Sequence, residues 1–298
     1  MKIRIGVGLG THTLTNDAAT FGPYVEQVEQ LGFDSLWLSE RLTGDAPDPL
    51  IALAVAAGRT TKLKLGTGVL VVPGRNPVVL AKELASLDRL SGGRLLPAVG
   101  LGAPAPVEHR AFGVTRKERS AWFDEALPLM RRLWTEDDVH HDGERFQVEG
   151  VTLRPRPVQD PIEVWLGGVA PSELRRCGRL GDGWLPSFCT VADVRDGWPV
   201  ITAEAAAHDR AIDPEHLGAL VTYARTGIPD RVAALLAHRR PELDPRDVIP
   251  VGVDALRTRL EDFVAVGASK FVVIPLEEPA AWDDELAEVA DAVLPLEN

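Results

Sequence analysis

The chain has 298 residues, of which 45% are apolar and 26% charged, and its net charge is −12. This composition provides for a large buried core and excludes a disordered or fibrous protein. Binding to phosphate backbones needs an excess of Lys and Arg, so the charge argues against nucleic acid and anionic membranes as partners. The length fits either two domains or one α/β barrel of about 250 residues.

Cysteine content and hydropathy indicate the compartment. The two cysteines, Cys177 and Cys189, form no Cys-x-x-Cys motif and cannot brace a chain of this length. No stretch approaches the ~18 apolar residues of a membrane-spanning helix, and the N-terminal apolar run is too short for a signal peptide. We therefore expect a protein of the reducing cytoplasm without a membrane anchor.

The first half of the chain alternates short β-branched runs with segments of helical period, which predicts parallel βα units. Strands are expected at 3–9, 34–39, 63–69 and 94–101, and helices at 21–31, at 49–60, around 80–87 and at 117–135. The strand centres recur about every thirty residues, which is the length of one βα unit. Pro128 lies inside the fourth helix, where it predicts a kink.

The second half contains an interruption and then further βα units. Glycines and prolines between 139 and 159 predict a hairpin insertion. Strands are expected next at 162–166, 183–186, 217–224 and 270–274, and helices at 171–180, 200–210, 230–239, 253–266 and 280–293. Eight strands with intervening helices predict a (β/α)8 TIM barrel over residues 1–298, one domain with an insertion after the fourth helix and an extra helical segment before the eighth strand. An open doubly wound sheet is the alternative, but the glycines at 6–10 lie in the first strand rather than at a helix N-terminus.

In a TIM barrel the chemistry lies at the C-terminal ends of the strands, which makes the residues there the candidates for a site. These residues are His12, Ser39, Glu40, Arg41, Gly68, Val69, Leu101, Gly102, Gly167, Gly168, Ser187 to Cys189, Thr226 and Glu277. No strand end has His and acidic residues in metal-ligand spacing, so no metal is predicted. Several strand ends finish in glycine, where a large planar or phosphorylated ligand can approach the backbone, although each glycine alone also suits a tight turn.

Two ordered motifs resemble a known family. The run from Gly32 to Arg41 (GFDSLWLSER), followed by the run from Leu65 to Pro77 (LGTGVLVVPGRNP), resembles the luciferase-like monooxygenase family of flavin and deazaflavin enzymes, and further matches follow at 81–94, 164–168 and 178–184. Within this family the chain is most similar to the actinobacterial branch that uses the deazaflavin coenzyme F420. The resemblance implies a TIM barrel, a homodimer and a cofactor bound in the barrel mouth.

The resemblance also implies roles for the residues at the strand ends. It places a non-prolyl cis peptide in a bulge at 68–69, behind the tricyclic ring of the cofactor. It brings 39–40 to the polar edge of the ring and 101–102 to its side, and the turn at 167–168 with the following helix receives the phosphate. The implied cofactor-binding residues are Ser39, Gly68, Val69, Leu101, Gly102, Gly167 and Gly168.

The chain departs from the sugar-phosphate dehydrogenases of the deazaflavin branch at two positions. Those enzymes carry a catalytic His where this chain has Arg41 and a catalytic Glu where it has Ala103, so their substrate and their acid–base pair are not expected here. Arg41 stays charged at ordinary pH and is a poor general base, but it can bind an anionic or carbonyl substrate or stabilise a reduced cofactor. We predict Glu40 and Arg41 as catalytic residues, although an exposed ion pair is an equally simple interpretation of them.

The leading hypothesis is an oxidoreductase that transfers a hydride between F420 and a small organic substrate. An FMN-dependent monooxygenase, a cofactor-binding protein without turnover and a metal-dependent hydrolase are the alternatives. The charge does not oppose an anionic cofactor, because residues 277–298 hold eight acidic residues and no basic one. The remaining residues carry 32 positive and 36 negative charges, so most of the acidity belongs to the last helix.

Overall fold

The computed structural model describes all 298 residues and contains one sheet of eight parallel strands in the order β8-β7-β4-β3-β2-β1-β10-β9. The strands are β1 (Arg4–Leu9), β2 (Ser35–Leu38), β3 (Lys64–Val71), β4 (Leu95–Gly100), β7 (Trp165–Leu166), β8 (Gly183–Trp184), β9 (Gly218–Tyr223) and β10 (Lys270–Pro275). The two edges of the sheet meet through parallel bridges from Trp184 to Leu217 and from Ser187 to Leu220. The sheet therefore closes into a barrel, and the predicted (β/α)8 fold is confirmed.

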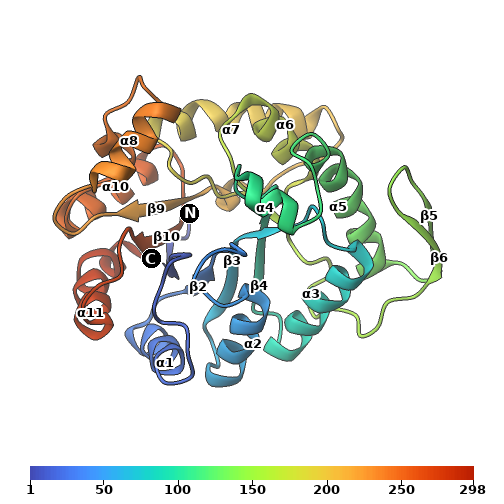
Figure 1. Cartoon of the computed structure of the whole chain (residues 1–298), viewed down its shortest axis with the longest axis horizontal. Coiled ribbons are helices and arrows are strands. Elements are labelled where there is room, and N and C mark those ends of the chain that lie inside the picture. The colour runs from blue at the N-terminus through green and yellow to red at the C-terminus, as the bar shows by residue number, and fades with distance from the viewer.

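Helices surround this barrel (Figure 1). They are α1 (Phe21–Leu31), α2 (Pro49–Arg59), α3 (Pro77–Ser91), α5 (Arg119–Thr135), α6 (Pro171–Leu180), α7 (Val191–Ala206), α10 (Val253–Ala265) and α11 (Trp282–Val293). Local sequence sets several of their ends. Asp48 and Asn76 accept hydrogen bonds from the first free N–H groups of α2 and α3, and a proline follows each of them at the first helical position. Gly32 ends α1 in the left-handed conformation, with φ of 90°.

Two tryptophans fill the barrel interior because the neighbouring strands carry glycines. A Cβ on Gly66 would lie 2.3 Å from the Trp37 ring, and a Cβ on Gly183 would lie 2.4 Å from the Trp165 ring. Both rings belong to a buried cluster inside the barrel, whose other members are Ala98, Leu185, Leu220, Val272 and Ile274. The interior is thus packed with side chains, and two cavities open at the C-terminal ends of the strands.

The additions to the barrel occur where the sequence predicts them. The hairpin of β5 (Val139–Asp142) and β6 (Gln147–Val151) forms a separate two-stranded sheet that projects from the barrel (Figure 1). The helices α8 (Asp230–Arg239) and α9 (Pro245–Val248) follow β9 and form the extra segment before β10. No helix is both long enough and apolar enough to span a membrane.

Some element boundaries differ from the predictions. Strands β7 and β8 have only two residues each, because only those residues make regular ladder pairs. Helix α7 begins at Val191 rather than near 200, because Thr190 and Asp193 cap it reciprocally, and it continues through Pro199. A short helix, α4 (Pro106–Ala111), lies where no helix was predicted, and α5 runs to Thr135 with Pro128 inside it, as predicted.

Candidate active site

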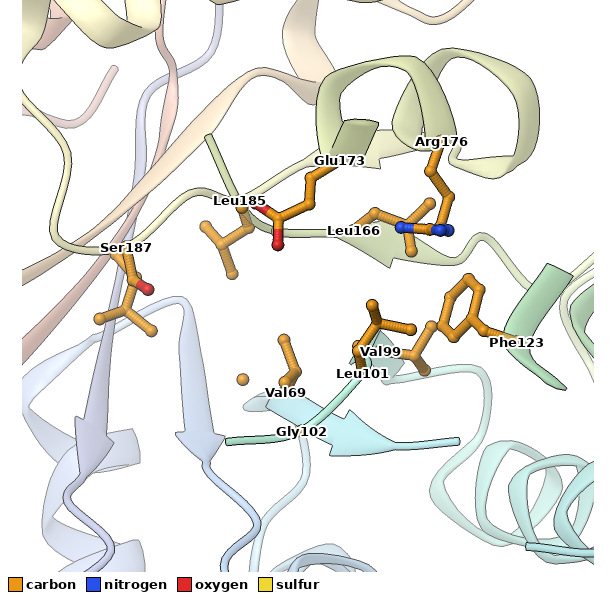
Figure 2. Close-up of a pocket in the computed structure, with 15 residues that line it drawn as sticks. Val69, Val99, Leu101, Gly102, Phe123, Leu166, Glu173, Arg176, Leu185 and Ser187 are labelled. Carbon is orange, nitrogen blue, oxygen red and sulfur yellow. The ribbon is translucent and has the colours of Figure 1, made fainter. Parts of the chain in front are cut away.

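Two cavities share the C-terminal mouth of the barrel. The first has a volume of about 190 Å³ and lies between the ends of β3, β4 and β7 and the start of α6 (Figure 2). Six of the seven predicted cofactor-binding residues line it, namely Gly68, Val69, Leu101, Gly102, Gly167 and Gly168. The structure therefore brings together residues that the sequence separates by a hundred positions.

The second cavity has a volume of about 390 Å³ and joins the first along Gly68, Ser187 and Leu220, which line both. The seventh predicted residue, Ser39, lies here. Nine of the 17 residues that line it have polar or charged side chains, among them Thr11, His12, Thr13, Thr222, Arg231, Glu277 and Glu278. One continuous mouth therefore has a glycine-rich apolar half and a polar half.

The bulge in β3 forms the wall between the two halves. The peptide bond between Gly68 and Val69 is cis, and the pairing of β3 with β4 shifts register between Gly68 and Leu70, as the resemblance predicts. The Ser39 hydroxyl donates to the Gly68 carbonyl over 2.7 Å, and the Glu40 N–H donates to the Val69 carbonyl over 3.1 Å. The end of β2 thus holds the bulge in place.

Glu40 contributes its side chain to the same support. Its carboxylate is 2% exposed, accepts the Val71 N–H over 2.6 Å and binds the guanidinium of Arg75. Burial raises the pKa of Glu40, against the opposing effects of the Val71 N–H and Arg75. Because the carboxylate is engaged in this way, Glu40 lines neither cavity.

Arg41, the second predicted catalytic residue, also lines neither cavity. Its side chain is partly buried, and its Nε has no hydrogen-bond partner. The positive charge of Arg41 helps to lower the pKa of Glu108. Arg41 therefore lies in the loop that follows β2, close enough to Glu108 for their charges to interact.

Glu108 is a functional candidate that the sequence analysis left unassigned. It lies in α4, is only 3% exposed, and accepts the Leu42 N–H over 3.1 Å, the Thr43 N–H over 3.0 Å and the Thr43 hydroxyl over 2.5 Å. Burial works to raise the pKa of Glu108, but the hydrogen bonds from Thr43 and Leu42, together with Arg41, lower it overall. Glu108 therefore remains ionised and fixes the loop after β2. No sequence signal places this carboxylate, because it depends on how α4 folds over the mouth.

Arg119 supports the other side of the first cavity. Its guanidinium donates to the carbonyl groups of Leu101 and Gly102 over 2.9 and 3.0 Å. Gly102 has φ of 80°, and a Cβ there would lie 3.0 Å from a methyl group of Val71. The segment after β4 thus has a conformation that suits glycine and a buried arginine that holds it.

Charged side chains of α6 reach the far end of the first cavity, where Glu173 and Arg176 both extend toward it (Figure 2). Arg176 donates to Asp124 over 2.7 Å, and Glu173 accepts the Ala170 N–H over 3.0 Å. A hydrogen bond from β8 fixes the turn before α6, because the indole of the buried Trp184 donates to the Gly168 carbonyl over 2.8 Å. This end of the cavity therefore offers a helix N-terminus and a cation that is already paired with Asp124, opposed by the carboxylate of Glu173.

The amino-acid sequence matches a family model and several known proteins. Residues 1–249 match the family model described as luciferase-like monooxygenase. The chain is 35% identical over 197 residues to the F420-dependent glucose-6-phosphate dehydrogenase of Intrasporangium calvum, and the match covers 60% of this chain and 57% of that protein. The chain spans between 50% and 57% of the length of this and two further dehydrogenases of the same name.

Solved structures match over the full chain. An F420-dependent secondary alcohol dehydrogenase in complex with an F420–acetone adduct has a TM-score of 0.81 at 17% identity, with 100% of both chains covered. The FMN-bound oxygenating constituent of 3,6-diketocamphane monooxygenase from Pseudomonas putida has a TM-score of 0.78 at 18% identity, with 100% of this chain and 99% of that one covered. At these identities the likeness establishes the shared fold.

Proposed function

Because the chain belongs to the luciferase-like monooxygenase family, we propose that it is an oxidoreductase that transfers a hydride between coenzyme F420 and a small organic substrate. The observation that carries this proposal is the meeting of six predicted cofactor-binding residues around one cavity that opens into a polar second cavity. The names of the similar dehydrogenases support the choice of F420. We assign the cofactor to the first cavity and the substrate to the second.

The residues present fit a planar phosphorylated cofactor. Five of the residues that line the first cavity are glycines, and a Cβ on Gly68 would meet no atom closer than 3.5 Å, so the space beside the bulge is open. The bulge would face the ring, and 101–102 would lie along its side. The turn at 167–168, the start of α6 and Arg176 would hold the phosphate. When bound, a deazaflavin accepts or donates a hydride.

In this proposal the two predicted catalytic residues, Glu40 and Arg41, act indirectly, from outside the two cavities. Glu40 keeps the bulge in the shape that the ring contacts, through its bonds to Val71 and Arg75. Arg41 supplies positive charge in the loop after β2, which favours a reduced cofactor that carries negative charge. The Arg41→Ala variant is expected to lower turnover, and unchanged turnover would remove Arg41 from the proposal.

The charges of the second cavity suggest an uncharged substrate. Its arginine, Arg231, lies 3.6 Å from Glu277, and Glu278 adds a second carboxylate. A doubly charged sugar phosphate needs a more positive pocket, and this chain also lacks the histidine and glutamate expected of sugar-phosphate dehydrogenases at 41 and 103. We therefore propose a polar, uncharged alcohol or carbonyl compound as the substrate.

A titration of the purified protein with F420 and with FMN, followed by cofactor absorbance, tests the proposal. We expect F420 to bind at least tenfold more tightly than FMN, and we expect Gly68→Leu, which fills the first cavity, to abolish binding. The control is Gly58→Leu, because Gly58 is exposed on α2 and a Cβ there would meet no atom within 4 Å. Tight binding of FMN with no response to F420 would support an FMN-dependent monooxygenase instead, for which the fold of the diketocamphane enzyme is a precedent.

We also propose that the protein is a homodimer located in the cytoplasm. The homodimer rests on the family resemblance. The location rests on Cys177 and Cys189, which are buried and unpaired, and burial raises the pKa of each thiol to about 12. Light scattering on the purified protein tests the first proposal, and fractionation of the producing cells tests the second.

A further inference from the structure

A histidine and an aspartate form a pair at the rim of the second cavity. His12 follows β1 and lines this cavity, and its Nδ1 lies 3.1 Å from Oδ2 of Asp45 in the loop after β2. When Asp45 accepts the Nδ1 proton, Nε2 is left without a proton and is free to accept one. No hydrogen bond from another protein group occupies Nε2.

Backbone hydrogen bonds hold the loop of His12 against the loop of Asp45. The Thr11 carbonyl accepts the N–H groups of Asp45 and Ala46 over 2.9 and 3.3 Å, and the Asn16 amide donates to the Asp45 carbonyl over 3.0 Å. A Cβ on Gly44 would lie 2.3 Å from the Thr11 carbonyl oxygen, so this close contact of the two loops requires glycine. The two loops that carry the pair are therefore held together by the fold, while the side chains of His12 and Asp45 remain 60% and 61% exposed.

Glu108 fixes the same loop from the opposite side. Its carboxylate binds the backbone of Leu42 and Thr43, which immediately precede Gly44 and Asp45 in the chain. The loop that carries Asp45 is thus attached both to α4 and to the segment after β1. Such attachment at both ends preorganises a site before substrate binds.

The other ionisable groups of the second cavity are poorly suited to exchange a proton with substrate. Arg231 stays charged and faces Glu277. Glu278 already accepts the Thr15 hydroxyl over 2.6 Å, the Trp282 indole over 3.0 Å and the Leu14 N–H. Burial works to raise the pKa of Glu278, but these hydrogen bonds lower it overall. Histidine is the residue type whose charge ordinarily changes between pH 5 and 8.

We propose that His12, oriented by Asp45, is the catalytic acid and base for the substrate of the proposed hydride transfer. In the oxidation of an alcohol, His12 Nε2 takes the hydroxyl proton as the O–H bond breaks and the carbon–oxygen double bond forms. The electron pair and hydrogen of the C–H bond leave together as hydride for the deazaflavin, so the substrate loses two electrons and the cofactor gains two. In the reverse direction His12 gives its proton to the carbonyl oxygen. Asp45 is a positioning residue, and this inference rests on the proposed function.

The first test measures activity and cofactor binding in parallel. In His12→Gln we expect kcat/KM for an alcohol substrate to fall by 10²- to 10⁴-fold, with the pH dependence of the wild type lost and the Kd for F420 changed less than twofold. The matched control is His140→Gln on the projecting hairpin. His140 is 59% exposed and lies 3.4 Å from Asp138, whereas His12 is 60% exposed and lies 3.1 Å from Asp45. We expect the control to behave like the wild type.

The second test needs no cofactor. NMR of the His12 ring nitrogens in the cofactor-free protein should show the neutral ring protonated at Nδ1 in the wild type and a mixture of both tautomers in Asp45→Asn, because the aspartate accepts the Nδ1 proton. If His12→Gln binds F420 normally and retains the wild-type kcat/KM and pH profile, the inference is overturned and the proposed function stands. If Asp45→Asn leaves the tautomer of the His12 ring unchanged, the pairing is overturned. If the wild type does not bind F420, both the proposed function and the inference are overturned.

Discussion

Replacement of Glu108 should release the loop that follows β2. In Glu108→Ala, three hydrogen bonds to one carboxylate are lost, and bonds of this kind contribute about 1.5–3 kcal/mol each when both partners are buried. Leu42 and Thr43 are exposed, so water replaces much of what is lost. We therefore expect a total loss of about 2–3 kcal/mol in the free energy of unfolding. Glu108→Gln keeps the volume and one acceptor oxygen but turns an NH2 group toward one of the N–H donors, and about 1–2 kcal/mol should be lost.

Hydrogen exchange shows which part of the chain loses stability. If the loop opens about 2 kcal/mol more easily, the amides of Leu42 and Thr43 should exchange roughly thirtyfold faster in Glu108→Ala, and urea unfolding gives the global change. Glu83→Ala is the control, since Glu83 is exposed on α3 and its side chain makes no hydrogen bond. Unchanged exchange at Leu42 and Thr43 in the Glu108 variants would refute the reasoning, whatever the effect on global stability.

The lowered pKa of Glu108 determines how the loss of stability in Glu108→Gln depends on pH. The folded pKa lies below the unfolded one, which is about 4.3, so the stabilisation is complete above that value and is lost as the pH falls through the folded pKa. The stability difference between wild type and Glu108→Gln should thus be largest near neutral pH and should shrink below about pH 4. Urea midpoints measured from pH 7 to pH 3 check this sign, and a difference that grows in acid would contradict it.

Three further variants probe the mouth of the barrel. Glu173→Gln should tighten F420 binding about three- to tenfold at low salt, by removing a carboxylate beside the phosphate position, and the gain should diminish as salt is added; weaker binding would show that Glu173 helps the cofactor. Trp184→Phe should cost about 1–3 kcal/mol in urea unfolding and weaken F420 binding, because the partly buried Gly168 carbonyl loses its donor; unchanged binding would show that the turn at 167–168 does not contribute to cofactor binding. Ser39→Ala should cost about 1 kcal/mol in the same assay and lower the affinity for F420, because the Gly68 carbonyl loses a donor; wild-type affinity would show that the bulge is stable without Ser39.

The sequence alone determined the order and type of the main elements, because the signals for these are local. The caps at Asp48 and Asn76 and the glycine at 32 act within one helical turn, and the apolar period of each segment shows which face it buries. Motif resemblance identified the bulge at 68–69 and six residues that line one cavity. Local signals were weak for β7 and β8, since regular pairing there extends over only two residues.

Only the tertiary structure decided which side chains act on one another across the mouth. Glu108 lies 66 residues from Leu42, and His12 lies 33 residues from Asp45. Each contact depends on the path of loops after the strands rather than on any local period. The same holds for Glu40, whose carboxylate faces Val71 and Arg75 instead of either cavity. The physical reason is that hydrophobic periodicity and capping specify backbone elements, whereas a buried carboxylate is specified by the donors that distant loops present to it.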